Sequence, residues 1–307
     1  MSDTDIQTTA VPEISVVVAS KVGAPFIDMC LDSLKDESEA LGAEVLVVLA
    51  DEADYKDRLA AKYPWVTIVP SGDQTKVPAM RGVGFDAARG EFIAVIEEHC
   101  AAGKDWLATG MAELKNSDAV SVGGPLYDAD YDNTPDWVVY FLEYNGAIPP
   151  FQNGPTDNLN DANIMYRRSI LEKHRPLLDD GYWPMNLHPT VLAEGHKLLA
   201  KNEMVVEHRG PFPFGYYLGQ RFLFSKAFAG VRAKSQSLPH RLFYILAAPI
   251  VPFLLLARIA MTVFKKKCRI GKFIQALPRL IIALFVMVAG EWLGYVFGPG
   301  DALSKVE

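Results

Sequence analysis

The sequence predicts an α/β fold in which a parallel β-sheet is covered by helices on both faces and is followed by a C-terminal region of apolar helices. Two observations support this prediction. From Ile14 to about Gly124, short β-branched runs alternate with segments of helical character, which is the pattern of a buried parallel sheet. Beyond residue 237, two apolar stretches, 242–264 and 280–297, approach the roughly 20 residues that span a bilayer.

The elements of the first part follow one another in a regular order. Strands are predicted where apolar residues run continuously, at 14–19, 44–49, 66–69 and 92–96. Helices are predicted between them, at 25–41, 56–62 and 78–88. Because ligands bind such sheets beyond the carboxyl ends of the strands, we expect a binding site formed by residues 19–21, 50–52 and 97–99.

The charge of the chain is distributed unevenly. The 307 residues carry a formal net charge of −7 and half of them are hydrophobic, which argues against a disordered chain and against nucleic acid as the main partner. Residues 238–307 contain nine Lys and Arg and three acidic residues, a net charge of +6, so residues 1–237 carry −13. An acidic domain joined to a basic, apolar tail is typical of a protein attached to an anionic membrane surface.

The two apolar stretches do not fit a simple pair of membrane spans. Pro249, Pro252 and Arg258 interrupt the first stretch, and Glu291 lies within the second. The basic link at 265–272 would lie on the far side of the membrane if both stretches crossed it, against the tendency of short basic loops to stay cytoplasmic. We therefore predict that the first stretch is re-entrant or interfacial, and that the second spans or also returns. Buried core helices of a soluble protein are the alternative.

The cysteines and the amino terminus indicate the cytoplasm. Cys30, Cys100 and Cys268 are an odd number without paired short spacing, which suggests neither a disulfide framework nor a zinc site. Residues 1–12, expected to be flexible, lack the features of a signal peptide. We predict a protein at the cytoplasmic face of the cell membrane, held there by residues 241–297. Its expected parts are a main domain at 13–209, an amphipathic interfacial segment at 210–240 and a membrane-associated helical region at 241–307.

Several segments resemble the nucleotide-sugar transferases of glycosyltransferase family 2. Residues 78–96 are similar to that family's ARNxG segment and the strand after it, and they lead into Glu97-Glu98-His99-Cys100, where the family has Asp-x-Asp. Residues 104–107 and 163–168 follow in the family's order, and Gly195 and His208 are spaced like its last motif. The resemblance covers roughly residues 12–235. It implies a GT-A fold, a Rossmann-like domain for a nucleotide-diphospho-sugar. The sequence has no Gly-x-Gly-x-x-Gly after the first strand and no P-loop. It therefore lacks the main motif of a dinucleotide-dependent dehydrogenase and that of a P-loop NTPase.

The resemblance assigns nucleotide and metal contacts at the strand ends. The implied nucleotide contacts are Ser20, Asp51, Arg81 and Glu97, of which Asp51 is expected at the base and Glu97 near the ribose. The implied ligands of a divalent metal, Mn²⁺ or Mg²⁺, are Glu98, His99 and His208. Imidazole suits Mn²⁺ better than Mg²⁺. The alternatives are a solvated acidic turn at 97–98, a helix N-cap at Asp51 and a solvated Arg81.

The catalytic base departs from the family pattern. Members of the family that invert the sugar's configuration place an Asp or Glu eleven residues before the glycine that corresponds to Gly195, and here that position is Pro184. Proline cannot accept a proton from the acceptor hydroxyl. Asp180 is our preferred substitute, with neighbouring Asp179 and His188 as further candidates; alternatively, the protein has lost transferase activity. An ordinary Asp-Gly turn also explains Asp180.

Acceptor contacts are expected on two segments. Residues 220–222 resemble, loosely, the Gln-x-x-Arg-Trp element of membrane-embedded members of the family, and aromatic and basic residues surround them. Plain packing between domain and membrane is the alternative. The predicted acceptor or phosphate contacts are Asn163, Arg167, Gln220, Arg221 and Arg232.

The resulting hypothesis is a membrane-associated glycosyltransferase that moves a sugar from a UDP- or GDP-sugar to a lipid-linked or glycan acceptor, with inversion, in polysaccharide or glycolipid biosynthesis. A catalytically silent relative that binds or scaffolds such an assembly machine is the second hypothesis. The expected partners are the nucleotide-diphospho-sugar donor, the acceptor and membrane lipids, without nucleic acid. Homo-oligomerisation stays open.

Overall fold

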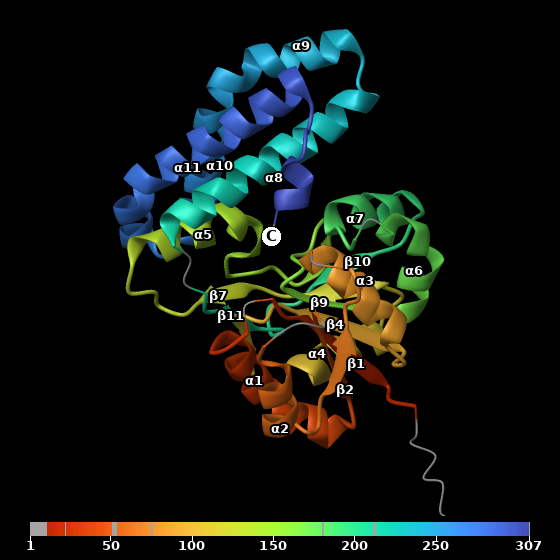
Figure 1. The fold of residues 1–307 in the computed structure, drawn as a ribbon. Coiled ribbons are helices and arrows are strands. Elements are labelled where there is room, and N and C mark those ends of the chain that lie inside the picture. The colour runs from red at the N-terminus through yellow and green to blue at the C-terminus, as the bar shows by residue number, and fades with distance from the viewer. Residues whose placement is uncertain are drawn as a thin grey trace, which may run out of the picture. The chain divides into compact units, whose positions relative to one another are not determined.

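The computed structural model describes residues 11–21, 23–50, 54–74, 76–179, 181–210 and 213–306. The chain divides into two compact units. The first unit runs up to Gly124 and resumes at Gln152–Val206, and the second comprises Pro125–Phe151 and the residues from Glu207 onward. Figure 1 shows the elements of both units along the chain.

The first unit is built on an eight-stranded sheet with the order β3-β2-β1-β4-β9-β6-β10-β8. Its strands are β1 (Ile14–Ala19), β2 (Glu44–Leu49), β3 (Thr67–Pro70), β4 (Phe92–Ile96), β6 (Ser121–Gly123), β8 (Gly154–Thr156), β9 (Asn163–Arg167) and β10 (Leu198–Ala200). The predicted parallel pairing is confirmed for β1 to β4. The other half of the sheet is mixed, because β9 runs antiparallel to both β4 and β6, and β8 runs antiparallel to β10.

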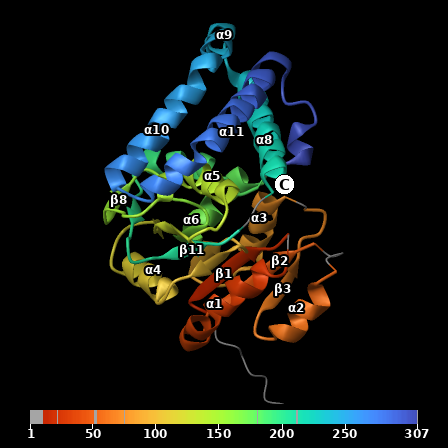
Figure 2. The same ribbon diagram turned by 90° about the vertical axis from the view of Figure 1, so that its left-hand side faces the viewer.

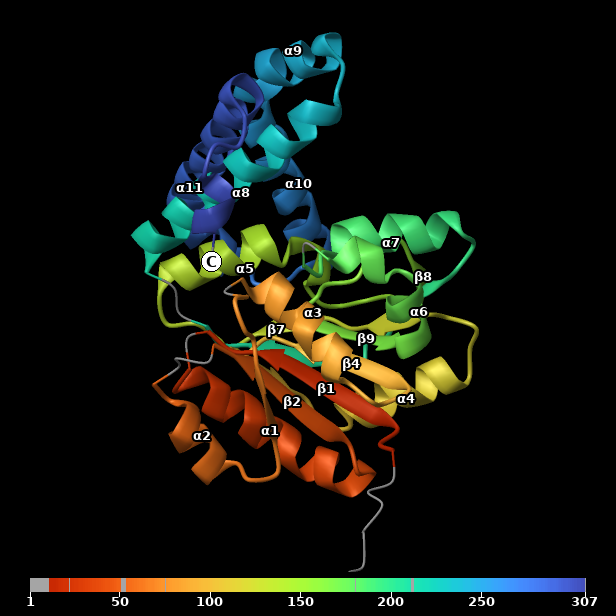
Figure 3. The ribbon, with the colours of Figure 1, turned by 45° about the vertical axis from the view of Figure 1, so that its right-hand side comes forward.

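Helices cover both faces of this sheet, as predicted. In Figures 1 and 3, α1 (Phe26–Leu41), α2 (Lys56–Lys62) and α4 (Trp106–Lys115) lie on one face, and α3 (Val77–Ala87), α6 (Arg168–Lys173) and α7 (Pro184–Ala193) lie on the other. Every residue of β1 and β4 is buried between these layers, which is why both strands are continuously apolar. On α3, Gly84 allows a close approach, because a Cβ there would collide with the side chain of Val17 on β1.

The second unit contains the apolar helices. Its elements are β7 (Leu126–Asp128), α5 (Thr134–Glu143), η1 (Asn145–Ala147), β11 (Val206–His208), which begins at the boundary between units, α8 (Phe214–Ser235), α9 (Leu238–Ala247), η3 (Ala248–Ile250), α10 (Val251–Lys266), α11 (Ile270–Phe297) and η4 (Ala302–Lys305). Helix α11 packs against α8, α5 and α10, and Figure 2 shows α8, α10 and α11 side by side.

The unit boundary differs from the linear division expected from the sequence. Residues 125–151, expected in the main domain, group with the C-terminal helices. The reason is an apolar contact across a long sequence separation: the ring of Phe141 on α5 lies edge-to-face against Phe273 on α11, with centroids 5.4 Å apart. Aromatic pairs of this kind bury large areas of apolar surface.

The prolines break the first apolar stretch, as expected. The chain passes from α9 through the short η3 turn into α10 at Pro249 and Pro252, and then reverses at 267–269 into α11. The segments Leu238–Lys266 and Ile270–Phe297 are long and apolar enough to cross a membrane, by length and composition only. The ring pairs Phe253–Phe285 and Phe264–Phe273 show that α10 and α11 are antiparallel neighbours.

Candidate functional site

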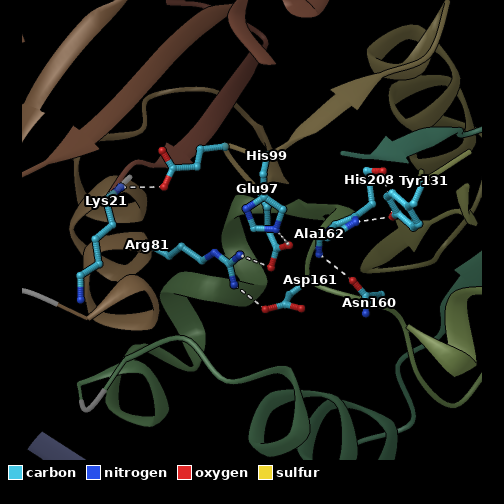
Figure 4. Close-up of polar contacts among 10 residues, drawn as sticks. Lys21, Arg81, Glu97, His99, Tyr131, Asn160, Asp161, Ala162 and His208 are labelled. Atoms are coloured by element: carbon cyan, nitrogen blue, oxygen red, sulfur yellow. Dashed lines mark hydrogen bonds and ion pairs between the residues drawn. The ribbon is translucent and has the colours of Figure 1, made fainter. Parts of the chain in front are cut away.

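An acid and a histidine meet where β4 ends. Glu97 Oε2 lies 3.0 Å from His99 Nε2, and Glu97 Oε1 accepts a hydrogen bond from Arg81 Nη2 at 3.1 Å. Both side chains are mostly buried, with 17% of Glu97 and 19% of His99 exposed. Figure 4 shows the guanidinium of Arg81 reaching this edge from α3. The structure therefore brings together three of the residues singled out in the sequence.

Arg81 also holds a second acid, Asp161. The Arg81 side chain is 3% exposed, and its Nη1 donates a short hydrogen bond to Asp161 Oδ2. Burial tends to lower the pKa of Arg81, but the carboxylates of Asp161 and Glu97 raise it above its ordinary value. Arg81 is thus a fixed cation that links two carboxylates, not the solvated arginine of the alternative interpretation.

Asp161 was missed in the sequence because the direction of β9 was unknown. In the antiparallel pair, Ile96 at the carboxyl end of β4 lies beside Asn163 at the start of β9. Residues that precede β9 therefore lie at the same sheet edge as Glu97. The local signal is an acid directly before a strand, Asp161-Ala162-Asn163, in a loop fixed by the Ala162 N–H donating to Asn160 Oδ1 at 2.9 Å.

Glu98 binds a loop. Its Oε2 accepts hydrogen bonds from Ser20 Oγ at 2.7 Å and from the Gly23 N–H at 3.0 Å, and its Oε1 accepts from the Lys21 N–H at 2.8 Å. Glu98 is 5% exposed and Ser20 is 1% exposed. The hydrogen bonds between these residues hold the segment that follows β1 in place. The metal contact predicted for Glu98 and the nucleotide contact predicted for Ser20 stay predictions that this bonding does not favour.

The residues suited to a metal are Glu97, His99 and Cys100, whose ligand atoms all lie within 4.8 Å of one another. The Cys100 thiol is fully buried, and burial raises its pKa well above the ordinary value, so it stays protonated and is a poor ligand. Carboxylate and imidazole donors remain, which suit Mn²⁺ and other transition metals. Glu97, rather than Glu98, therefore accompanies His99 in this cluster.

His208 belongs to the second unit. The Tyr131 hydroxyl donates to the His208 carbonyl oxygen at 2.9 Å and lies next to Nδ1 of the same residue. Since that hydroxyl has only one proton, Nδ1 is the donor of the second contact, and the lone pair of the ring is on Nε2. This tautomer suits a metal ligand. The metal role of His208 stays a prediction.

Two predicted acceptor contacts, Asn163 and Arg167, have hydrogen-bond partners within the first unit. Asn163 is fully buried, accepts from Trp106 Nε1 at 2.8 Å and donates to the Met204 carbonyl at 2.7 Å. Arg167 lies beside Phe92, at the opposite sheet edge from Glu97, and its guanidinium donates to backbone carbonyls at the end of α4 and just after it. The acceptor role of Arg167 stays a prediction that this position and these contacts do not favour.

The structure describes only some of the predicted catalytic and nucleotide-binding residues. Asp51 and Asp180 lie outside the described residues. Pro184 begins α7. His188, 1% exposed, has its Nε2 2.6 Å from Tyr166 OH and its Nδ1 3.1 Å from Asn158 Oδ1. Burial lowers the pKa of His188 to about 4. With both ring nitrogens engaged, His188 supports the fold around Tyr166, and its catalytic role stays a prediction.

The predicted acceptor residues of α8 lie in the second unit. Arg221 donates to Glu143 Oε2 at 2.7 Å, and its guanidinium lies 4.7 Å from the ring centroid of Phe224. Arg232 pairs with Glu291. Gln220 is half-buried. Both arginines are thus matched by acids of their own unit, so a phosphate would have to compete with those acids for them.

Comparisons with known proteins agree with this architecture. The sequence profile described as "Glycosyl transferase family 2" matches residues 15–175, which is more than half of the chain. EpsH of Bacillus subtilis (strain 168), by name a glycosyltransferase, is 26% identical over 181 residues, 53% of this chain; the match spans about half of that relative, 49%.

Solved structures share the fold. The mannosyltransferase PcManGT from Pyrobaculum calidifontis, in complex with GDP-Man and Mn²⁺, aligns with a TM-score of 0.56 at 17% identity, over 96% of this chain and 88% of its own. GalNAc-T7 with UDP, GalNAc and Mn²⁺ aligns with a TM-score of 0.50 at 14% identity, over 66% of this chain and 45% of its own. At these identities the likeness concerns the fold, which is the predicted GT-A type. Together with the profile match, it leads to one conclusion: the chain belongs to glycosyl transferase family 2.

Proposed function

We propose that this protein transfers a sugar from a UDP- or GDP-sugar to an acceptor hydroxyl, with inversion at the anomeric carbon. The observation that carries the proposal is the cluster of Glu97, His99 and Arg81 at the carboxyl end of β4. Ligands bind α/β sheets at this edge. The related structures contain GDP-Man or UDP together with Mn²⁺, which supports a nucleotide donor and a divalent ion here.

Glu97 and His99 are the residues that would hold the divalent ion. When bound, such an ion neutralises the charge of a diphosphate leaving group. Arg81 orients Glu97 by a hydrogen bond from a buried and fixed guanidinium. Glu98 accepts hydrogen bonds from the Ser20 hydroxyl and from the backbone N–H groups of Lys21 and Gly23, which follow β1. Contact of Asp51 with the nucleotide base remains part of the proposal on sequence grounds alone.

A membrane surface is proposed as the place of the acceptor. The large apolar side chains that are exposed on α9, η3, α10 and α11 are Leu238, Leu242, Phe243, Tyr244, Leu246, Ile250, Phe253, Leu254, Met261, Phe264, Ile274, Ile281, Ile282, Phe285, Trp292 and Phe297. A surface this apolar is typical of membrane contact. We propose that it binds the cytoplasmic face of the cell membrane and that the acceptor is lipid-linked or a glycan.

Interfacial contact is favoured over a pair of spans. Arg258 on α10 and Arg279 on α11 are both exposed. Given the ring pairs Phe253–Phe285 and Phe264–Phe273, the two arginines lie at a similar height of the antiparallel helices. Exposed charges at one level within two neighbouring apolar helices are costly inside hydrocarbon, whereas they suit a headgroup layer.

Vesicle flotation tests the membrane proposal. Wild-type protein is expected to float with vesicles of phosphatidylglycerol and phosphatidylcholine and to bind more weakly as salt rises. Lys265→Glu with Lys267→Glu should weaken this binding, since each basic residue near an anionic surface contributes about 1 kcal/mol. Lys35→Glu with Lys56→Glu, on helices of the first unit, is the matched control. Labelling of Cys268 from the side opposite the catalytic unit would contradict an interfacial arrangement.

Calorimetry tests the donor proposal. Wild-type protein is titrated with GDP-mannose, UDP-N-acetylgalactosamine and further nucleotide sugars, each with Mn²⁺ or Mg²⁺. Binding that requires the metal is expected, and Glu97→Gln or His99→Ala should weaken it by roughly tenfold or more. His196→Ala, half-buried away from β4, is the control. If wild-type protein binds no nucleotide sugar with either metal, the donor proposal is wrong.

A catalytically silent binding or scaffolding subunit is the second candidate. Pro184 at the expected base position and Glu-Glu-His in place of Asp-x-Asp favour it. Metal-dependent nucleotide binding without turnover, in the presence of membranes and acceptor extracts, would support this second function over the first.

A further inference from the structure

The proposed reaction requires a proton acceptor at this site, because the attacking hydroxyl loses its proton. Pro184, at the expected position, has no titratable group. The Asp179 side chain is 70% exposed and pairs with Arg175 at 3.2 Å. His188 already accepts a hydrogen bond from Tyr166. Each of these described candidates is therefore unsuitable or otherwise engaged.

Asp161 has the geometry that these residues lack. Its carboxylate and that of Glu97 are bound by the two terminal nitrogens of one guanidinium, that of Arg81, so the two acids are close neighbours. The Asp161 side chain is 31% exposed. Oδ2 faces Arg81, whereas Oδ1 accepts no hydrogen bond from the described residues. One oxygen is thus anchored, and the other is available to a substrate.

The anchor of Asp161 is rigid. The Arg81 guanidinium lies over the ring of Tyr182, 5.9 Å from its centroid. The Tyr182 hydroxyl is 2.7 Å from Tyr166 OH, and the Tyr182 N–H donates to the Pro78 carbonyl at 2.8 Å. Figure 4 shows Arg81 between Glu97 and Asp161. A side chain held by packed, hydrogen-bonded neighbours is prepared for catalysis without reorganisation.

We propose that Asp161 is the general base of the transfer reaction, an inference that rests on the proposed function. The acceptor O–H proton moves to Asp161 Oδ1 while the acceptor oxygen forms a bond to the anomeric carbon. The bond between that carbon and the phosphate oxygen breaks, and its electron pair leaves with the nucleoside diphosphate. Protonated Asp161 then returns the proton to solvent. Arg81 is a positioning residue in this step, because it orients the carboxylate and touches no reacting atom.

Donor hydrolysis, with water in place of the unidentified acceptor, tests this role. Full-length variants in detergent are compared on the nucleotide sugar that wild-type protein binds best, beginning with GDP-mannose and Mn²⁺. Asp161→Asn should lower kcat, measured with donor and Mn²⁺ at saturation, by about 10²–10⁴. Asp161→Ala should be equally slow, and sodium formate should restore part of its rate, because formate can take the proton in the vacated space.

The matched control is Asp86→Asn. Asp86 also forms an Arg–Asp pair, with Arg175 at 2.6 Å, so its loss reports the general effect of breaking such a pair. Wild-type kcat is expected for this variant. Asp180→Asn tests the competing position.

Several results would overturn the inference. They are wild-type kcat in Asp161→Asn, loss of donor affinity at unchanged kcat, absence of formate rescue in a folded Asp161→Ala, or a comparable loss of kcat in Asp180→Asn alone. Failure of the proposed function is distinct, because then wild-type protein itself binds no nucleotide sugar.

Discussion

Arg232 of α8 and Glu291 of α11 form an ion pair within the second unit, with Nη2 3.0 Å from Oε1. The Arg232 guanidinium also lies over the ring of Tyr295, 5.7 Å from its centroid. A lone carboxylate in the middle of an apolar helix is costly near lipid. The pair explains how α11 tolerates an acid in such a position. It also occupies a cation that the sequence suggested for binding phosphate.

A double-mutant cycle measures this pair. Arg232→Met and Glu291→Gln are each expected to destabilise the protein, and the double variant should lose less than the sum of the two. Because half of Arg232 is exposed, the coupling should be only about 1 kcal/mol. Thermal unfolding in detergent provides the measurement, with the exposed pair Asp301–Lys305 as a control that shows no coupling. Strict additivity at Arg232 and Glu291 would contradict the prediction.

The buried cation of the first unit should matter more for stability. Arg81→Met leaves the carboxylates of Glu97 and Asp161 as close neighbours without their shared partner. Removal of one partner from a buried ion pair costs about 3 kcal/mol, so the unfolding midpoint should fall by several degrees. Arg175→Met, which breaks an exposed pair with Asp86, should have little effect. Equal shifts in the two variants would argue against a special role of Arg81.

His188 should make stability depend on pH. Burial holds its pKa at about 4 in the folded state, whereas an unfolded histidine titrates near 6.5. Between these values only the unfolded chain binds the proton, so this contribution is present above pH 6.5 and is lost as the pH falls towards 4, by up to about 3 kcal/mol. His188→Gln should remove that dependence, as seen in unfolding midpoints from pH 7.5 to 4. His240→Gln, at an exposed position, should retain the wild-type dependence.

Small residues set the distance between α8 and α11. A Cβ at Gly294 would collide with the carbonyl oxygen of Lys226 and meet Ala229 Cβ at 2.9 Å. Gly294→Leu is therefore expected to cost about 1–3 kcal/mol by overpacking. Protease resistance of the C-terminal helices and the unfolding midpoint should both decrease. Gly219→Ala is the control, because nothing lies within 4 Å of a Cβ at that position of α8.

The sequence predicts the first half of the sheet closely, because buried parallel strands leave a continuous apolar pattern. The observed bounds of β1, β2 and β4 equal the predicted ones. The direction of β9 is not encoded in this way, since a buried strand has the same pattern whether it runs parallel or antiparallel. That ambiguity concealed Asp161, which precedes β9 and lies at the same end of the sheet as Glu97.

The grouping of residues 125–151 with the C-terminal helices was equally hidden. It depends on contacts such as Phe141 with Phe273, which join segments more than a hundred residues apart and leave no local periodicity.

Local patterns likewise cannot tell which acid of a pair faces a ligand. Glu97 and Glu98 are identical in type and adjacent, and only the structure separates their partners.

The hydrogen bonds of Glu98 with Ser20, Lys21 and Gly23 have a consequence for the order of ligand entry. Because that carboxylate is committed to the chain, Glu97 and Asp161 are the acids that face Arg81, and together the three side chains leave a single negative charge. This single negative charge, together with the imidazole of His99, attracts a divalent cation only weakly. A diphosphate would supply the missing oxygen ligands and charge, so metal and nucleotide should enter as a pair, each raising the affinity for the other.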